Sequence, residues 1–211
     1  MKKFKSFIFD MDGTILNSSL LNIEAFRYAV EPWGIKITYD DIERIRHHKS
    51  DTLFRDFLPN HQDHKIAFER LTKFAREQAD KIQLFPGILE ILKRIKKNGP
   101  FLGLWTGRDS ESAVHLLKQK GLYQLFEAVV GSSCVQNNKP HPEGLLKIIQ
   151  QSKVSPADTV VIGDHEHDIR AAKMSGCFAI YARWGELYEI PFGEYQPDLI
   201  LNDTNDLAAM I

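Results

Sequence analysis

The sequence has few cysteines and no long apolar run. Its two cysteines, Cys134 and Cys177, form no CxxC motif, which favours core thiols in a reducing compartment over a disulfide-stapled secreted domain. The apolar stretch near the N-terminus is short and runs into Asp10, so neither an export signal nor a spanning helix is supported. We therefore expect a cytoplasmic protein with no membrane partner.

The sequence also lacks an excess of charge of either sign. Lys and Arg number 27 against 28 Asp and Glu, a formal net charge of -1, so no surplus marks a nucleic-acid or anionic-membrane binder. Neither a P-loop nor a G-x-G-x-x-G motif occurs, which removes the usual nucleotide-binding signatures. Partners must therefore be inferred from individual sites.

Short apolar runs that end in polar or glycine residues recur along the chain. They lack clean alternation, which is typical of parallel strands buried on both faces. Helical patterns lie between most of them, so the order is strand-helix repeated, and we predict an α/β fold with a doubly wound parallel sheet. The predicted strands are residues 7–10, 101–107, 128–133, 160–164, 178–182 and 199–203.

One region interrupts this alternation. From Ser18 to Ile82 no convincing strand occurs, only amphipathic segments such as 19–34 and 66–82. We therefore expect a helical insertion at 18–82 in a core made of 1–17 and 83–211, with hinges near 17–20 and 83–86.

The stretch "FIFDMDGTIL" (7–16) places two aspartates at the end of the first predicted strand. Residues i and i+2 of an extended chain point the same way, so Asp10 and Asp12 project together and repel. A shared proton or a bound cation relieves this repulsion, and Mg²⁺ prefers oxygen ligands. A simple Asp-Gly turn is the alternative. A calcium loop fails, because its twelfth residue should be Glu and here is Leu21.

Other strand ends also carry polar groups. Thr106 and Gly107 offer a hydroxyl and free backbone N–H groups for an anion, although a capped helix start at Thr106, Asp109 or Ser110 explains this stretch equally simply. Arg108 adds a nearby cation.

Further along, Lys139 precedes a proline in a loop, and Asp164 ends a strand four residues before Asp168. The carboxyl ends of parallel strands share one crevice, so these groups converge with Asp10, Asp12 and Thr106. Such a cluster suits phosphoryl transfer around a metal ion.

In order, "DMDGT" (10–14), Thr106, Lys139 and "GDHEHD" (163–168) resemble the haloacid dehalogenase superfamily of phosphohydrolases. The position of the insertion resembles the subgroup with a helical cap, as in phosphoglycolate phosphatase and β-phosphoglucomutase. The resemblance implies a Rossmann-like catalytic core (1–17 and 83–211) and an all-helical cap (18–82).

The resemblance also implies roles. Asp10 is the expected nucleophile, and Asp12 the acid and then the base. Thr106, Gly107 and Lys139 are expected to hold the phosphoryl group. Mg²⁺ would be held by the Asp10 carboxylate, the Asp12 carbonyl and Asp164, with Asp168 as a further ligand or an orienting neighbour. Asp12 also disfavours dehalogenation, because dehalogenating members lack it.

Two features depart from the family or compete with this interpretation. His165 stands where related phosphatases carry a small residue, and it could face the metal's surroundings or the substrate. The histidine groups at 47–48, 61 and 64, and 165–167 could suggest zinc, but none has a full ligand set, so we rank zinc below magnesium.

The cap should decide the substrate. In its 45–59 stretch, Arg46, His48 and Lys49 are candidates for binding the leaving group of the substrate. An equal alternative is that these residues only form a helix face exposed to solvent. The favoured function is a Mg²⁺-dependent phosphatase acting on a small phosphorylated metabolite (phosphoglycolate- or sugar-phosphate-like). A phosphomutase and a non-catalytic binding module are the alternatives. We expect a monomer or weak homodimer.

Overall fold

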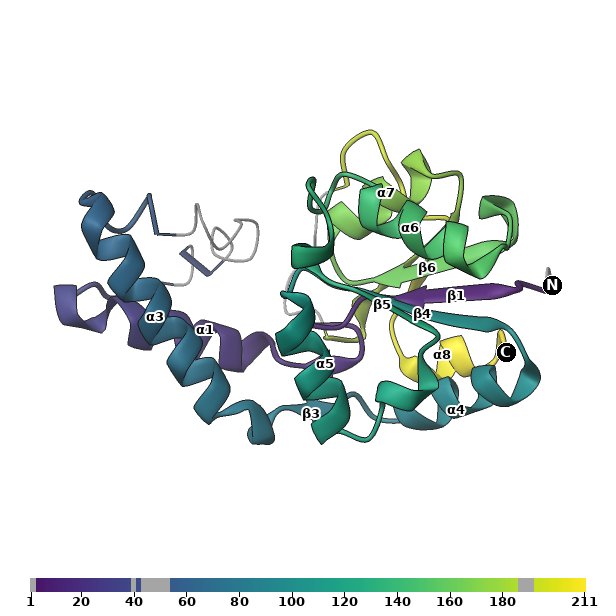
Figure 1. The fold of residues 1–211 in the computed structure, drawn as a ribbon, viewed down its shortest axis with the longest axis horizontal. Helices are drawn as coiled ribbons and strands as arrows, with labels where there is room; N and C mark the ends of the chain where they lie inside the picture. The colour runs from purple at the N-terminus through teal and green to yellow at the C-terminus, as the bar shows by residue number, and fades with distance from the viewer. Residues whose placement is uncertain (1–2, 39–40, 43–53, 186–191) are drawn as a thin grey trace. The chain divides into compact units, whose positions relative to one another are not determined.

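The computed structural model describes residues 3–38, 41–42, 54–185 and 192–211. The chain divides into two compact units, one formed by 1–17 with 83–211 and the other by 18–82 (Figure 1). We describe each unit separately, and we call the first the core unit.

The core unit is built on a six-stranded sheet in the order β5-β4-β1-β6-β7-β8, and every neighbouring pair is parallel. In the central strands, Phe9 is in register with Leu104 on one side and Ile162 on the other, so these strands end at one rim. The predicted α/β fold is confirmed. The strands are β1 (Ser6–Phe9), β4 (Phe101–Trp105), β5 (Ala128–Val130), β6 (Thr159–Gly163), β7 (Phe178–Ala182) and β8 (Leu199–Leu201).

Helices cover both faces of this sheet, with α6 and α7 on one face and α4 and α8 on the other (Figure 1). Every residue of β1 and β6 is buried, which explains why these strands read as continuous apolar runs. The helices are α4 (Ile88–Asn98), α5 (Ser110–Gln119), α6 (Glu143–Ser152), α7 (Glu166–Met174) and α8 (Thr204–Ala208); the 3₁₀ turns are Tyr123–Leu125, Ser132–Cys134, Pro156–Asp158 and Arg183–Gly185.

Two short strands, β2 (Leu16–Asn17) and β3 (Gln83–Leu84), pair antiparallel where the chain leaves and re-enters the core unit. Asn17 lies opposite Gln83, so the two ends of the intervening segment are adjacent in space. These strands were not predicted, because two residues are too few to show an alternating pattern. They fall at the predicted hinge positions.

The second unit contains helices and no strand among its described residues. Its elements are α1 (Ser19–Val30), the 3₁₀ turn Glu31–Trp33, α3 (His61–Glu77) and the 3₁₀ turn Ala79–Lys81. Its small core is aromatic, with Phe26 stacked on Phe54 at 5.2 Å between ring centroids and Ala67 of α3 fully buried. The side chain of Asn60 caps α3 by accepting a hydrogen bond from the Gln62 N–H. No helix in the described part of the chain has the length and apolar character needed to span a membrane.

Candidate active site

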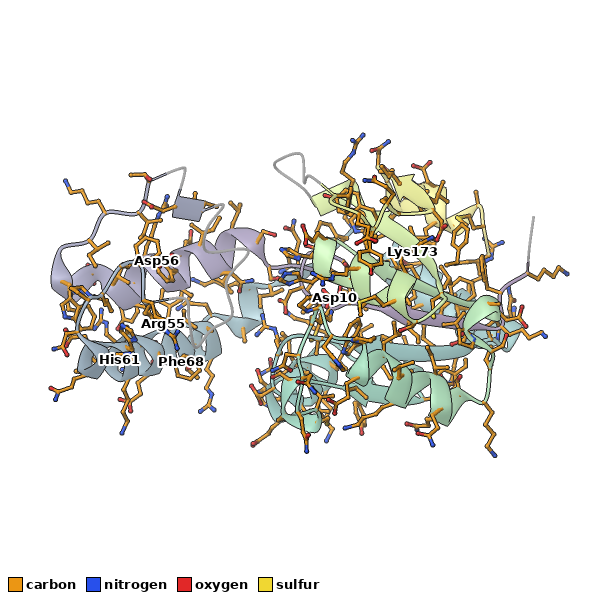
Figure 2. All side chains as sticks on the ribbon, turned by 90° about the horizontal axis from the view of Figure 1, so that it is seen from above. Asp10, Arg55, Asp56, His61, Phe68 and Lys173 are labelled. Carbon is orange, nitrogen blue, oxygen red and sulfur yellow. The ribbon has the colours of Figure 1, made fainter. Side chains whose placement is uncertain are left out.

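An acidic cluster lies at the rim where β1 and β6 end. Asp10 follows β1 directly, and its N–H donates to the carbonyl of Ile162 at 2.8 Å. Asp164 follows β6, and Asp168 belongs to the first turn of α7. One carboxylate oxygen from each of the three aspartates lies within 4.8 Å of the others. Figure 2 labels Asp10 at this end of the core unit.

The ammonium of Lys139 lies among these carboxylates. Its Nζ donates to Asp10 Oδ1 and, at 2.6 Å, to Asp168 Oδ1, and it lies 4.5 Å from the centroid of the Trp105 ring. Burial raises the pKa of Asp10 to about 7; Lys139 opposes this rise and Asp168 adds to it. Burial lowers the pKa of Lys139, but the attraction of Asp10 and Asp168 outweighs burial and raises it overall.

The charge balance of this cluster fits a divalent cation. The three aspartates are almost fully buried, and three carboxylates with one ammonium leave a formal charge of -2. Their ligand atoms are all carboxylate oxygens, the type that Mg²⁺ prefers. Among the described residues, this is the one group of three or more histidine, cysteine, aspartate or glutamate side chains with ligand spacing, and it contains no histidine.

Gly13 and Thr14, which follow the two aspartates, both contact the side chain of Asp164 or leave space for it. Gly13 has φ +76°, and a Cβ atom there would lie 1.9 Å from Asp164 Oδ2. The hydroxyl of Thr14 donates to Asp164 Oδ1 at 3.3 Å. The backbone of this turn therefore leaves room for the Asp164 carboxylate beside Asp10. Sequence reasoning predicted that the two aspartates converge, but it did not identify the role of Gly13.

The Gly13→Ala variant is expected to bind the metal ion more weakly, because the added methyl group displaces the Asp164 carboxylate from the cluster. Gly121→Ala is a matched control, because Gly121 has φ +67° but a Cβ atom there would meet no described atom within 4 Å. Both variants carry the strain of a positive φ, about 1–3 kcal/mol. Calorimetric titration with Mg²⁺ should show weakened binding in Gly13→Ala alone. Equal Mg²⁺ affinity in the two variants would contradict this role of Gly13.

Thr106 lies at the end of β4 and is 2 % exposed. Its N–H donates to the Val130 carbonyl at 3.0 Å, so the expectation of a free N–H at Thr106 is wrong: the parallel pairing with β5 continues by one residue. The Thr106 hydroxyl accepts from the Arg108 N–H at 3.2 Å. Asp109 caps α5 by accepting from the Ser112 N–H at 2.9 Å, as the alternative interpretation of this stretch had it.

Arg108 pairs with Asp12 through both carboxylate oxygens. Its Nε donates to Oδ2 at 2.5 Å and its Nη2 to Oδ1 at 2.7 Å. The two side chains are 20 % and 24 % exposed, respectively, so the pair is accessible from solvent. Sequence reasoning gave Arg108 only as a nearby cation; its position two residues after Thr106 was the available signal.

His165 is the N-cap residue of α7. Its Nδ1 accepts from the His167 N–H at 3.1 Å, and its own N–H donates to Asp168 Oδ2 at 3.2 Å. An imidazole at this position therefore satisfies a free donor at the helix start and helps to hold Asp168.

The loop that carries Lys139 is held by Glu143, the first residue of α6. The Glu143 carboxylate accepts from the N–H groups of Gln136 and Asn137 at 3.1 and 2.9 Å and pairs with Lys147 at 3.1 Å. The two backbone hydrogen bonds, followed by that of Lys147, lower the pKa of Glu143 to about 2.

This shift in the pKa of Glu143 predicts a contribution to folding stability that is lost in acid. Because the folded pKa is depressed from 4.5 to about 2, the contribution of Glu143 is complete above the ordinary value and is lost as pH falls toward 2. The difference in unfolding free energy between wild type and Glu143→Gln, measured with urea, should therefore shrink across that window. Glu194→Gln, at an exposed glutamate, controls for net charge. A constant difference across the window would contradict the prediction.

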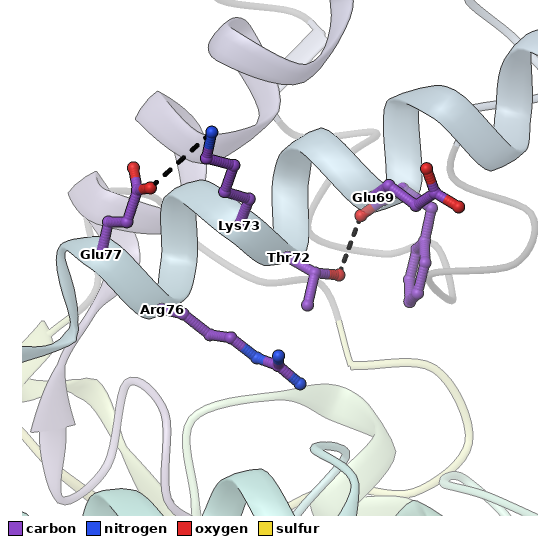
Figure 3. Close-up of a pocket in the computed structure, with 6 residues that line it drawn as sticks. Glu69, Thr72, Lys73, Arg76 and Glu77 are labelled. Carbon is purple, nitrogen blue, oxygen red and sulfur yellow. Dashed lines mark hydrogen bonds and ion pairs between the residues drawn. The ribbon is translucent and has the colours of Figure 1, made fainter.

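The cap candidates Arg46, His48 and Lys49 lie outside the described residues. A surface hollow in the second unit is lined by one helix alone, α3, as Figure 3 shows. Lys73 and Glu77 pair there at 3.9 Å, and Thr72 donates to the carbonyl of Phe68. None of the hollow's lining residues belongs to the acidic cluster, so we do not assign it to the active site. The lining residues are Phe68, Glu69, Thr72, Lys73, Arg76 and Glu77.

Known proteins resemble this chain over most of its length. Pyrophosphatase PpaX from Bacillus pumilus is 30% identical over 208 residues, covering 97% of this chain and 94% of the relative. Phosphoglycolate phosphatase from Shigella boydii is 31% identical over 153 residues, covering 72% of this chain and 61% of the relative. The solved structure of a haloacid dehalogenase-like family hydrolase from Streptococcus pneumoniae has the same fold, with a TM-score of 0.82 at 23% identity; the match covers 98% of this chain and 97% of that one.

A family model for haloacid dehalogenase-like hydrolases matches residues 7–182, a range that contains Asp10, Thr106, Lys139 and both later aspartates of the cluster. With most of its length matched, the chain belongs to the haloacid dehalogenase-like hydrolase family.

Proposed function

We propose that the protein is a Mg²⁺-dependent phosphatase that hydrolyses a small phosphorylated metabolite through an aspartyl-phosphate on Asp10. The observation that carries the proposal is the buried cluster of Asp10, Asp164 and Asp168 with Lys139 in contact with Asp10. The printed names of two relatives, a pyrophosphatase and a phosphoglycolate phosphatase, support the same class of reaction.

In the first step an Asp10 oxygen attacks phosphorus and the bond from phosphorus to the leaving oxygen breaks. Asp12 gives its proton to that oxygen, and Lys139 offsets the negative charge of Asp10 and the phosphoryl group. In the second step water attacks phosphorus, Asp12 takes a proton from the water, and the bond from phosphorus to Asp10 breaks. Phosphate leaves and both aspartates return to their starting states.

Mg²⁺ would be held by the carboxylates of Asp10, Asp164 and Asp168 and by the Asp12 carbonyl. It would supply positive charge that lets an anionic carboxylate approach an anionic phosphoryl group. Thr106 and Gly107 would contact the phosphoryl oxygens, the first through its buried hydroxyl.

We further propose that residues 18–82 act as a cap, which excludes water and contacts the leaving group, with Arg46, His48 and Lys49 as candidate contacts. A cytoplasmic location agrees with the two free cysteines among the described residues, Cys134 and Cys177.

The test is phosphate release from p-nitrophenyl phosphate with Mg²⁺ and with excess EDTA. We expect steady release with the metal and its loss with EDTA. Incubation with sugar phosphates separates the phosphomutase alternative, because a mutase yields an isomerised sugar phosphate in place of free phosphate. A protein that releases no phosphate from any phosphorylated metabolite in a panel would instead be a binding module.

A further inference from the structure

The contact between Arg108 and Asp12 has a consequence for the choice of substrate. Both oxygens of Asp12 accept hydrogen bonds from the guanidinium, at 2.5 and 2.7 Å. In the described part of the chain, Asp12 is the one carboxylate that this guanidinium contacts. Under the proposed function, however, Asp12 must also engage the leaving oxygen of the substrate, and whichever carboxylate oxygen does so already accepts a hydrogen bond from this guanidinium.

The backbone of Arg108 is held next to the Thr106 hydroxyl. The Arg108 N–H donates to the Thr106 hydroxyl, and its carbonyl accepts from the Ser132 N–H at 2.7 Å. Gly131 packs close to the same carbonyl, because a Cβ atom at Gly131 would lie 2.6 Å from it. A substrate that engages Asp12 therefore competes with the guanidinium for this carboxylate, while the backbone of Arg108 stays in place.

We infer that Arg108 exchanges Asp12 for a negative charge on the leaving group, so that the substrate is a phosphate ester or anhydride whose leaving group carries its own carboxylate or phosphate. This inference rests on the proposed function and narrows it. A planar carboxylate or a phosphate fits the fork of an arginine through two parallel hydrogen bonds, as Asp12 does here.

The position of Arg108 beside Asp12 limits how far the anion of the leaving group can lie from the leaving oxygen. The leaving oxygen lies next to Asp12 when it receives the proton, and the guanidinium already lies within hydrogen-bond distance of the same carboxylate. An anion a few bonds beyond the leaving oxygen therefore suffices. A leaving group without charge, such as a neutral sugar hydroxyl, provides no second anion for the arginine, which is unfavourable for a side chain that is only 20 % exposed.

Binding of unreactive phosphonates tests the inference without turnover. 3-Phosphonopropionate carries a carboxylate where propylphosphonate carries a methyl group, and neither can be hydrolysed. Calorimetry with Mg²⁺ should show that the wild type binds the carboxylate compound at least about tenfold more tightly. Arg108→Gln should remove this preference, and Arg108→Lys should keep part of it, because lysine retains the charge without the fork.

Asp12→Asn provides a readout that a merely structural role of Arg108 would not produce. With Asp12 no longer competing as an anion, the guanidinium should bind 3-phosphonopropionate more tightly than in wild type, while propylphosphonate binding should change much less. Arg94→Gln is the matched control: Arg94 is an exposed arginine of the core unit that donates to the Ala208 carbonyl, and its loss should leave the preference intact.

Steady-state kinetics provide a second test and distinguish a carboxylate from a phosphate on the leaving group. The ratio of kcat/KM for phosphoglycolate, and separately for pyrophosphate, over that for p-nitrophenyl phosphate should fall at least about tenfold in Arg108→Gln. An unchanged binding preference in both Arg108 variants, or no preference in wild type, overturns the inference. Absence of turnover in wild type would instead defeat the proposed function, and the phosphonate comparison would still decide the role of Arg108.

Discussion

Replacement of Asp10 by asparagine is expected to abolish phosphatase turnover, with a loss of at least about 10⁴-fold in kcat, a size found when a covalent nucleophile is removed. A carboxamide is a poor nucleophile toward phosphorus, so no aspartyl-phosphate forms. The fold should survive, because burial already disfavours the charged form of Asp10 and a neutral amide of similar shape avoids that cost. Lys139 also keeps Asp168 as a partner.

The measurement is phosphate release from p-nitrophenyl phosphate, with thermal unfolding recorded on the same samples. Asp158→Asn is the matched control, since Asp158 is a carboxylate of the core unit that pairs with Lys5 on the surface, at 3.1 Å. It should retain activity. An Asp10→Asn protein that keeps wild-type turnover would refute the covalent mechanism.

Replacement of Lys139 by methionine is expected to destabilise the metal-free protein by about 3–5 kcal/mol, the cost of leaving buried charge without its partner. Lys139 contacts both Asp10 and Asp168, and Asp168 is 2 % exposed, so water cannot take the place of the ammonium there. Mg²⁺ should restore much of the lost stability, because a divalent cation bound to the folded state neutralises the same carboxylates. Activity should stay very low even with the metal, since the phosphoryl group loses its cation.

Urea unfolding in EDTA and in excess Mg²⁺ measures these effects. The matched control is Lys5→Met, because the side chain of Lys5 is 71% exposed in its pair with Asp158. Such a surface pair contributes about 0–1 kcal/mol, so this variant should resemble wild type in both conditions. If Lys139→Met were as stable as wild type in EDTA, the charge balance inferred for the cluster would be wrong.

The layered fold could be predicted because strands that are buried on both faces of a sheet appear in the sequence as short apolar runs. Strands such as β1 and β6 are buried at every position and carry a polar side chain only at their first residue, and the aspartate that follows each one marks the rim. The two-residue strands β2 and β3 left no such trace. Their pairing depends on how the core unit closes, which no local pattern records.

The candidate site was predictable to the extent that backbone position decides it. Strand ends brought Asp10 and Asp164 to one rim, and the loop before α6 brought Lys139 there. The pairing of Arg108 with Asp12 depends on the side-chain conformations of two residues 96 positions apart, so spacing alone could not give it. The position of Gly13 against Asp164 is a close approach visible only in three dimensions.

The antiparallel pairing of Asn17 with Gln83 brings the two ends of the 18–82 segment together, so a different segment could be inserted at the same place. All members of the acidic cluster, together with Lys139, Arg108 and Thr106, come from outside that segment, and its two ends meet as neighbours on one short ribbon. A chimaera that splices a foreign segment between these two positions would keep every core residue that we propose for phosphoryl transfer. Substrate choice beyond the charge next to the leaving oxygen could thus diverge among relatives while the chemistry stays the same.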